Sequence, residues 1–155
     1  MPPIVTVKPW AALGRDEFFE IASLRCQVFY VEQRVDEQEF DATDRAPDTL
    51  HAWVADAAGV AGYLRMTASE RPELRDARRS FGRVAVRADR RGEGLARLLI
   101  DEVMARFGDE AMLLHAQEYI QPLYTGYGFE AVGGRYIEAG IPHVMMYRPA
   151  GGRPA

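Results

Sequence analysis

Residues 81–107 constrain the fold most strongly, because a strand, a glycine-bearing turn and a helix follow one another there without interruption. The strand is expected at Phe81–Arg87, with Val84 and Val86 on one face, and the polar turn DRRGEG ends at Gly94. Apolar side chains then recur at three- and four-residue steps, at Leu95, Leu98, Leu99, Val103 and Phe107. The turn therefore leads directly into the first turn of an amphipathic helix.

A helix N-terminus of this kind can bind phosphate. Its first backbone N–H groups lack partners within the helix, and the helix dipole adds partial positive charge there. Gly92 and Gly94 would let a ligand approach the backbone closely, and Arg90 or Arg91 can add charge-assisted hydrogen bonds. The alternative is an ordinary solvated turn. The spacing matches neither the phosphate loop that ends in Gly-Lys-Ser/Thr nor the dinucleotide-binding glycine pattern.

The rest of the chain alternates short strands with amphipathic helices. Helices are expected from Arg15 to about Val31 and at Glu118–Tyr127. Strands are expected at residues 5–7, Leu50–Ala55, Val60–Met66, Met112–Ala116, Phe129–Val132 and His143–Tyr147, the last two forming a closing hairpin. Residues 32–44 should form a loop with one short helical turn. No repeat or linker divides the chain, so we expect one domain over residues 1–149 and a flexible tail at 150–155.

Composition and charge argue against several classes of protein. The 155 residues include one cysteine, Cys26, and three histidines without metal-ligand spacing, which argues against a disulfide and against a metal site. A net charge of −4 argues against nucleic-acid binding. The apolar runs are shorter than the roughly 20 residues that cross a bilayer. Because the N-terminus also lacks a signal-peptide pattern, we expect a cytoplasmic protein that does not engage a membrane.

The segment Arg91–Ala96, RGEGLA, resembles the R/Q-x-x-G-x-G/A signature of the GNAT N-acetyltransferases. Further motifs are similar to those of the ElaA-like branch and lie in the same order over most of residues 20–147: LRCQVFYVEQ, EFDATD, GRVAV, LHAQEYIQPLY, YGF and EAGIPH. Two positions depart from the pattern. Ala96 stands where glycine is commoner, and Ala139 stands where the branch is expected to have Asp. The second departure removes any role assigned to that carboxylate.

The resemblance implies an α+β fold whose central, mostly antiparallel twisted sheet has about seven strands and flanking helices. Two neighbouring strands would diverge near Val86 and Leu114 and open a slot for acetyl-CoA. The backbone of Val84 and Val86 would pair with the pantetheine arm, with Gln117 close to it. The pyrophosphate would lie on the backbone N–H groups of Arg91, Gly92, Glu93, Gly94, Leu95 and Ala96. The acetyl group would pass directly to the amine of a small-molecule acceptor, in a monomer or homodimer.

Three side chains are candidates for proton transfer, because acyl transfer needs a neutral amine and a protonated sulfur leaving group. Tyr124 lies in QPLYTGYGF, where GNAT members often carry a tyrosine that protonates the departing thiolate; the alternative is a packing tyrosine. Glu32 and His143 are candidate bases. The alternative for Glu32 is a structural ion pair with Arg25 or Arg65, and the alternative for His143 is a strand histidine satisfied by backbone. Cys26 is expected to be a small buried residue rather than a nucleophile.

Six acids lie within the thirteen residues 32–44, and inside that span only Arg34 offsets them. They are Glu32, Asp36, Glu37, Glu39, Asp41 and Asp44. In the family that the chain resembles, this segment borders the acceptor entrance, so the run predicts a cationic acceptor; a solvated acidic loop is the alternative. Two other functions stay open, namely an acyltransferase with a longer acyl donor and a CoA-binding module without catalysis.

Overall fold

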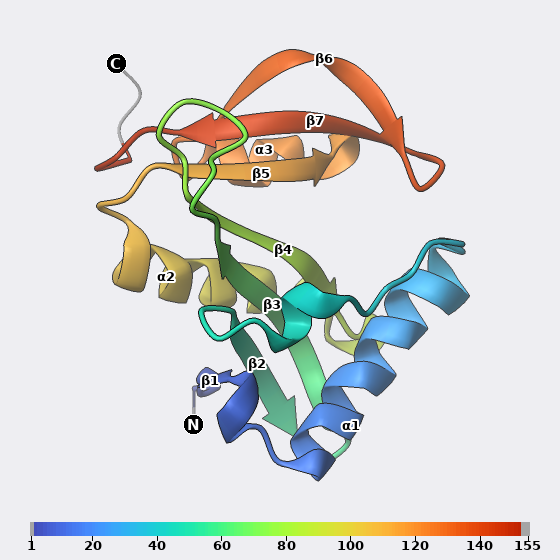
Figure 1. Ribbon diagram of the computed structural model, residues 1–155. Coiled ribbons are helices and arrows are strands. Elements are labelled where there is room, and N and C mark those ends of the chain that lie inside the picture. Colours follow the sequence, from blue (N-terminus) through green and yellow to red (C-terminus); the bar gives the residue numbers. More distant parts are fainter. Residues whose placement is uncertain (1, 153–155) are drawn as a thin grey trace.

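The computed structural model describes residues 2–152 and is built around one seven-stranded sheet in the order β1-β2-β3-β4-β5-β7-β6 (Figure 1). The strands are β1 (Thr6–Pro9), β2 (Leu50–Asp56), β3 (Gly59–Ala68), β4 (Arg79–Val86), β5 (Met112–Gln117), β6 (Glu130–Glu138) and β7 (Ile141–Arg148). Every neighbouring pair is antiparallel except β4 and β5. The mostly antiparallel sheet of about seven strands is therefore confirmed.

The helices are α1 (Arg15–Arg25), α2 (Leu95–Phe107) and α3 (Gln121–Thr125). α1 continues without a break into the π-helical segment η2 (Cys26–Glu32), where the N–H of Gln33 donates to the carbonyl of Val28 at 3.0 Å. The predicted extent of the helix of residues 15–31 is thus confirmed. From Cys26 onward its hydrogen bonding changes from the α-helical to the π-helical pattern. The predicted helix at 118–127 is shorter, because a 3-10 turn at Glu118–Ile120 precedes α3. The helical turn expected in the acidic loop is η3 (Ala42–Arg45).

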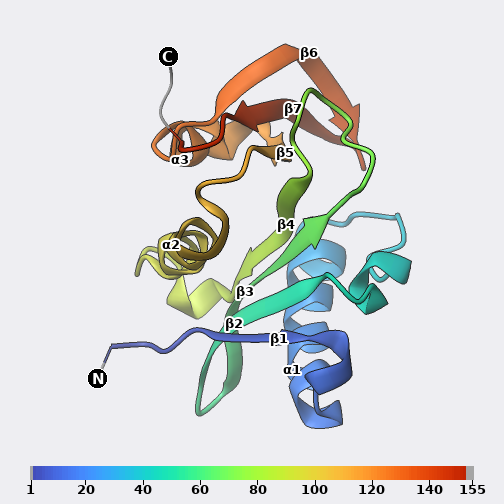
Figure 2. The same cartoon turned by 60° about the vertical axis from the view of Figure 1, so that its left-hand side comes forward.

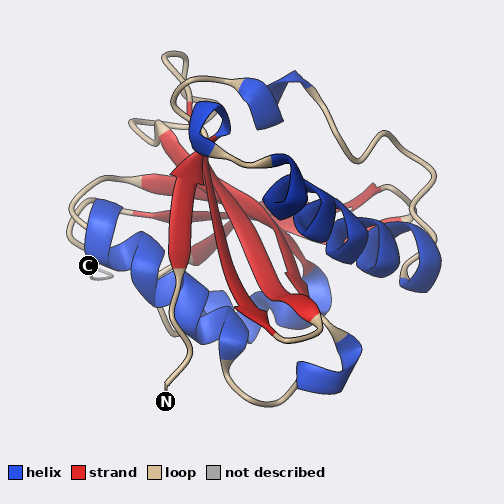
Figure 3. Cartoon of the chain, turned by 90° about the horizontal axis from the view of Figure 1, so that it is seen from below, coloured by secondary structure: helices blue, strands red, loops and turns tan. Residues whose placement is uncertain are grey.

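α1 and α2 cover opposite faces of the sheet (Figure 3). On one face, Leu99, Ile100 and Val103 of α2 are fully buried against the central strands. On the other, Ile21 and Leu24 of α1 pack on apolar residues of β2, β3 and β4, namely Trp53, Val60, Tyr63 and Ala85. Each fully buried side chain of this kind contributes about 1.5–3 kcal/mol, so both helices hold the sheet firmly.

The sheet opens between β4 and β5. These parallel strands pair only at Arg79 with Met112 and at Ser80 with Leu113, and beyond those pairs they no longer form a ladder. β5, β6, β7 and α3 lie on one side of the opening, with β1 to β4 on the other (Figure 2). The predicted divergence of two central strands is therefore confirmed, and it positions the site described below.

One extra residue in β4 sets which side chains face this opening. Gly82 lies opposite Arg65 and Ala85 lies opposite Tyr63, so three steps along β4 match two along β3. Arg83, at the bulge, has a φ of +53°, which is unusual for a residue other than glycine. The bulge reverses the alternation, so Ala85 packs on the α1 side. Phe81, Val84 and Val86 pack on the α2 side, and the predicted shared face of the two valines is confirmed.

A second irregularity bends β6, the strand at the end of the sheet. Val132 pairs with Met145 and Tyr136 pairs with His143, so four steps along β6 match two along β7. Gly133, with a φ of +77°, lies in the extra loop of chain. The bulge brings the second half of β6 back onto β7 beside His143.

No helix among residues 2–152 is long and apolar enough to cross a membrane. Residues 150–152 follow β7 as a turn. The remainder of the tail expected at 150–155, residues 153–155, lies outside the described residues.

Candidate active site

A cavity of about 510 Å³ lies where β4 and β5 separate. β4 contributes Phe81 and Val84 to its walls, β5 contributes the stretch 114–117, and β7 contributes His143. The loop after η2, residues 33–43, forms the opposite wall with both polar and apolar side chains. The divergence of two strands therefore creates a mixed polar and apolar chamber rather than a filled core.

A second pocket of about 180 Å³ lies at the turn between β4 and α2. Most residues predicted to hold phosphate line it, namely Arg91, Gly92, Gly94, Leu95 and Ala96. Val86, predicted to pair with the pantetheine arm, lines it too, as do Arg90 and Arg97. Glu93 does not line the pocket; its carboxylate instead accepts a hydrogen bond from Nε of Arg90 at 3.0 Å. Val84 lines the large cavity and Val86 the small pocket, so β4 runs from one to the other.

The turn has the backbone that an anion site needs. Gly92 and Gly94 have φ values of +80° and +82°, which favour glycine, and a Cβ on either would project into open space. Gly94 immediately precedes α2, and its carbonyl accepts the first helical hydrogen bond, from Leu98 at 3.0 Å. The N–H groups of the first turn of α2 are therefore free of helical partners and lie beside the pocket. These features fit a phosphate group.

Tyr124 lines the large cavity from α3. Its ring packs edge-on against Phe81 and Phe129, with centroids 5.8 and 6.2 Å apart, so the packing alternative describes the ring correctly. Among residues 2–152 no side chain or backbone group hydrogen-bonds to its hydroxyl. Burial, assisted by the nearby Tyr119, raises the pKa of Tyr124 to about 12. The phenol is thus a neutral donor at physiological pH.

His143 lines the same cavity from β7 and is almost completely buried. Its Nδ1 lies 2.7 Å from the carbonyl of Ile141, and because a carbonyl only accepts, the proton of the neutral ring is on Nδ1. Nε2 is then the unprotonated nitrogen, with Glu138 Oε2 3.4 Å away. Tyr136 stacks on the ring at 5.9 Å between centroids. The arrangement holds the imidazole in the tautomer that accepts a proton at Nε2.

Glu32 is not brought together with Tyr124 and His143. Its carboxylate is bound by Nη2 of Arg91, with one oxygen at 3.1 Å and the other closer, and it does not line the large cavity. The ion pair considered for Glu32 in the sequence was with Arg25 or Arg65; the structure gives it Arg91 instead. Gln117 lines the cavity, and its amide donates to Gln33 at 2.9 Å. Cys26 is partly buried and also lies outside the cavity lining.

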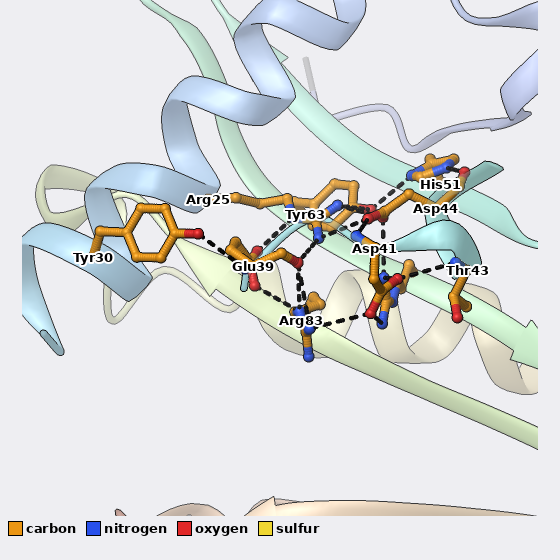
Figure 4. Close-up of polar contacts among 10 residues, drawn as sticks. Arg25, Tyr30, Glu39, Asp41, Thr43, Asp44, His51, Tyr63 and Arg83 are labelled. Carbon is orange, nitrogen blue, oxygen red and sulfur yellow. Dashed lines mark hydrogen bonds and ion pairs between the residues drawn. The ribbon is translucent and has the colours of Figure 1, made fainter. Parts of the chain in front are cut away.

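The acidic loop is largely neutralised by arginines from distant segments (Figure 4). Nε of Arg25 donates to Glu39 at 2.6 Å and its Nη1 donates to Asp44 at 2.6 Å. Arg83 contacts the other Glu39 oxygen at 2.6 Å. Arg65 binds Asp41 at 3.0 Å and Asp44 at 3.1 Å. Three arginines therefore balance three of the six carboxylates, which are not free to attract a cation.

Two further polar groups complete this network. Nε2 of His51 donates to the carbonyl of Asp44 at 2.9 Å, which leaves Nδ1 to accept the hydroxyl of Tyr63 at 2.7 Å. Burial lowers the pKa of His51 and raises that of Tyr63, so both stay neutral. Burial alone would raise the pKa of Asp44, but hydrogen bonding and charge from Arg25 outweigh it and lower that pKa. The network fixes the loop as one wall of the cavity.

Sequence reasoning missed this network and a second one at the cavity. His115 of β5 contacts the hydroxyl of Tyr136 through Nδ1 and the carboxylate of Glu73 through Nε2 at 2.9 Å. A signal for the first network was present: Arg25 lies on the apolar stripe of its helix, between Ile21 and Val28, and a buried arginine requires carboxylate partners. No comparable signal marks His115.

The part of the chain that the structure describes contains no cluster of three or more His, Cys, Asp or Glu side chains that could hold a metal ion.

Comparisons with known proteins agree with this geometry. Residues 19–148 match the family model described as an acetyltransferase (GNAT) domain. A UPF0039 protein of Mycobacterium tuberculosis is 33% identical over 146 residues, covering 93% of this chain and 92% of that protein. Protein ElaA of Escherichia coli is 32% identical over 142 residues, covering 88% and 90%.

Two solved structures are similar over nearly the whole chain. The crystal structure of an acyl-CoA N-acyltransferase from Pseudomonas aeruginosa has a TM-score of 0.85 and 33% identity, covering 95% of this chain and 99% of that one. The crystal structure of Escherichia coli ElaA has a TM-score of 0.84 at 27% identity, with the same coverage.

Proposed function

Because the chain belongs to the GNAT acetyltransferase family, in its ElaA-like branch, we propose that it transfers an acetyl group from acetyl-CoA directly to the amine of a small-molecule acceptor. One observation carries the proposal. The glycine turn opens onto a pocket that β4 connects to a larger cavity, and Tyr124 and His143 both line that cavity. The proposed phosphate site thus lies in the small pocket, and the proposed proton donor and acceptor lie in the cavity that β4 connects to it.

The residues present fit the cofactor. Backbone N–H groups at the start of α2 would hold the pyrophosphate, and Arg91 and Arg97, which line the same pocket, would add positive charge. The edge of β4 from Val84 to Val86 is free of pairing with β5, so its backbone is available to the pantetheine arm. Gln117 lies at the end of β5, across the opening from β4, and lines the large cavity. When bound, acetyl-CoA supplies the activated thioester.

Tyr124 is proposed as the general acid. A departing thiolate needs a proton, and a neutral phenol inside the cavity can donate one. The hydroxyl has no hydrogen-bond partner among residues 2–152, which leaves it available to the leaving group. Burial of the ring keeps the donor protonated and fixes its direction.

His143 is proposed as the general base, and Glu32 is the weaker candidate because Arg91 holds its carboxylate. An alkyl amine arrives mostly protonated, so a group in the cavity must accept its proton before or during transfer. Nε2 of His143 carries a lone pair in the tautomer set by Ile141. Glu138, 3.4 Å away, would stabilise the imidazolium after the proton has moved.

The proposed function predicts release of CoA thiol when acetyl-CoA is incubated with a panel of primary amines, and acetyl-CoA should also stabilise the fold. A ligand at about 100 times its dissociation constant raises the free energy of unfolding by about 2.7 kcal/mol. Gly94→Asn should abolish both effects, because its side chain would enter the open space beside the turn. Asn tolerates positive φ, so the variant should still fold.

Thiol release and thermal unfolding measure the two effects, and hexanoyl-CoA beside acetyl-CoA tests the acyl length. A wild-type protein that neither binds nor turns over acetyl-CoA with any amine would leave the proposal without support. Unchanged binding in Gly94→Asn would show that the turn is not the phosphate site.

A cationic acceptor is also proposed, but it rests on two carboxylates of the cavity and not on the whole acidic loop. After the arginine network is counted, Glu37 and Glu138 are the lining carboxylates without an arginine partner in residues 2–152. For a dicationic amine, kcat/KM should fall as ionic strength rises, and Glu37→Gln should lower it about two- to fivefold at low salt. Asp36→Asn is the matched control, since Asp36 is exposed in the same loop but does not line the cavity.

Steady-state kinetics with the diamine and with a neutral analogue measure the effect. An equal loss of kcat/KM in Glu37→Gln and Asp36→Asn would assign the effect to general surface charge. Unchanged kcat/KM in both variants would rule out the cationic acceptor.

A further inference from the structure

Arg91 is held in place from two sides at the edge of the small pocket. Its Nε donates to the carbonyl of Val86 at 3.0 Å, and its Nη2 donates to both oxygens of Glu32. The guanidinium therefore lies across the end of β4, where the pocket begins. Both Arg91 and Glu32 are partly exposed, so their ion pair is one that solvent and ligands can reach.

Glu32 and Arg91 belong to segments attached to different helices, α1 and α2, which cover opposite faces of the sheet. Glu32 is the last residue of the π-helical segment η2, which continues α1, whereas Arg91 belongs to the turn before α2. The next residue, Gln33, accepts a hydrogen bond from the amide of Gln117 at the end of β5. The end of η2 thus contacts the phosphate turn through one residue and the far side of the opening through the next.

The ion pair between Glu32 and Arg91 differs from the other ion pairs of the turn. Arg87 and Arg90 both bind Asp56, at 2.5 and 2.6 Å, and each has a second carboxylate partner within the turn itself, Asp89 or Glu93. Within residues 2–152, the one carboxylate that binds Arg91 is that of Glu32. The turn's ion pairs therefore contain three arginines and four carboxylates, and Arg91 is the arginine among them with a single carboxylate partner.

Glu32 is more easily exchanged than Asp56, because it binds a single arginine. Asp56 is shared by two arginines and its pKa is strongly lowered by the hydrogen bond from Arg87, so it stays ionised and bound. An exposed pair with one arginine contributes little to stability and is broken at small cost. A phosphate oxygen is as good an acceptor for a guanidinium as a carboxylate oxygen.

We propose that Glu32 is a positioning residue that holds Arg91 at the mouth of the pocket and gives it up to the cofactor pyrophosphate. This inference rests on the proposed function. Glu32 then acts through Arg91 to weaken cofactor binding, and it takes no part in proton transfer. Binding exchanges one partner of Arg91 for another, and the end of η2 is released from the turn as the cofactor enters.

Calorimetric titration with CoA, which needs no acceptor, tests the exchange. Glu32→Gln should bind CoA about three- to tenfold more tightly, because the phosphates no longer have to displace a carboxylate from Arg91. Glu102→Gln is the matched control: it removes the same kind of carboxylate from an exposed pair, with Arg106 on α2 at 2.7 Å, and should leave CoA affinity unchanged.

A double-mutant cycle with Arg91→Ala separates the two ways in which Glu32 could act. If Glu32 acts through Arg91, its replacement should change CoA affinity by less than about twofold in the Arg91→Ala background. An undiminished effect there would mean that Glu32 repels the ligand directly, which overturns the proposal. Thermal unfolding without ligand should be the same for wild type and Glu32→Gln, as expected for an exposed pair.

Turnover separates this role from that of a base. Glu32→Gln should keep its kcat and show a lower KM for acetyl-CoA. A large loss of kcat with unchanged CoA affinity would make Glu32 the base and overturn the inference, while the proposed function would stand. Wild-type protein that does not bind CoA at all would instead remove the proposed function itself.

Discussion

Replacing Tyr124 with Phe is expected to lower kcat by about 10²–10⁴-fold and to leave the affinity for acetyl-CoA unchanged. The substitution removes one hydroxyl and keeps the ring that packs on Phe81 and Phe129. Burial and then the neighbouring Tyr119 raise the pKa of Tyr124 to about 12, so the donor is protonated throughout the neutral range. Its protonation is lost only as the pH rises through that value, and turnover should show no alkaline loss from this group below about pH 10.

Tyr127→Phe is the matched control for this experiment. Tyr127 lies three residues further on, and its hydroxyl donates to Asp101 at 2.7 Å, outside the cavity. Its removal should change kcat by no more than about twofold, and Cys26→Ala should be equally mild. Steady-state kinetics with acetyl-CoA and the most active amine measure all three variants. A Tyr124→Phe protein that retains wild-type kcat would assign the leaving-group proton to another donor.

Replacing Arg25 with Met should lower the free energy of unfolding by about 3–5 kcal/mol. Arg25 is completely buried and donates to Glu39 and Asp44, and the substitution leaves both carboxylates buried with one partner fewer. For a chain of this length the loss corresponds to a fall of about 6–20 °C in Tm. Methionine fills a similar volume, so the loss should arise mainly from unpaired charge rather than from a cavity.

The pH dependence of this loss follows from the pKa of Asp44. Burial alone would raise that pKa, but Arg25 outweighs burial and lowers it. A lowered pKa stabilises the fold above the unfolded value and ceases to do so as the pH falls through the folded value. The difference between wild type and Arg25→Met should therefore shrink in acid. Urea unfolding at neutral and acid pH measures it.

Arg106→Met is the control for removing an arginine that has a carboxylate partner. Its pair with Glu102 is exposed, so the change should cost less than about 1 kcal/mol. If Arg25→Met were no more harmful than this control, the buried network would not be what holds the acidic loop in place.

The strand, turn and helix of residues 81–107 could be predicted because their signals are local. Alternating valines, two glycines and a helical apolar stripe lie within thirty residues, and each acts on its own neighbours. The small pocket forms at the same place because the turn determines where its backbone N–H groups lie. Local chemistry of this kind needs no knowledge of distant contacts.

The acidic loop could not be interpreted in the same way. Its charge appeared unbalanced because the balancing residues, Arg25, Arg65 and Arg83, are up to 44 positions away from Glu39 in the chain. The partner of Glu32 was likewise missed, since Arg91 is 59 positions further on. Long-range pairing depends on which strands are neighbours, so the position of Arg25 on an apolar stripe indicates that carboxylate partners exist but does not identify them.

The bulge of β4 was also beyond sequence reasoning, although the predicted face of Val84 and Val86 proved right. Regular alternation would place Phe81 and Ala85 on the same side, and the structure puts them on opposite sides. Arg83 supplies the extra residue and bends the strand at the point where the cavity opens. A positive φ at an arginine is a feature that tertiary contacts impose.

The bulge in β6 between Val132 and Tyr136 affects how readily the molecule can associate with itself. A strand at the end of a sheet offers a row of unpaired N–H and C=O groups on which another chain can add a strand, a common first step in aggregation. β6 occupies that place, but the turn of chain around Gly133 interrupts its regular spacing after Val132. Exposed Arg135 and Glu138 put charge on the second half. An incoming strand would find no straight edge to extend, so the feature that brings Tyr136 to His143 also makes this side of the protein a poor template for fibres.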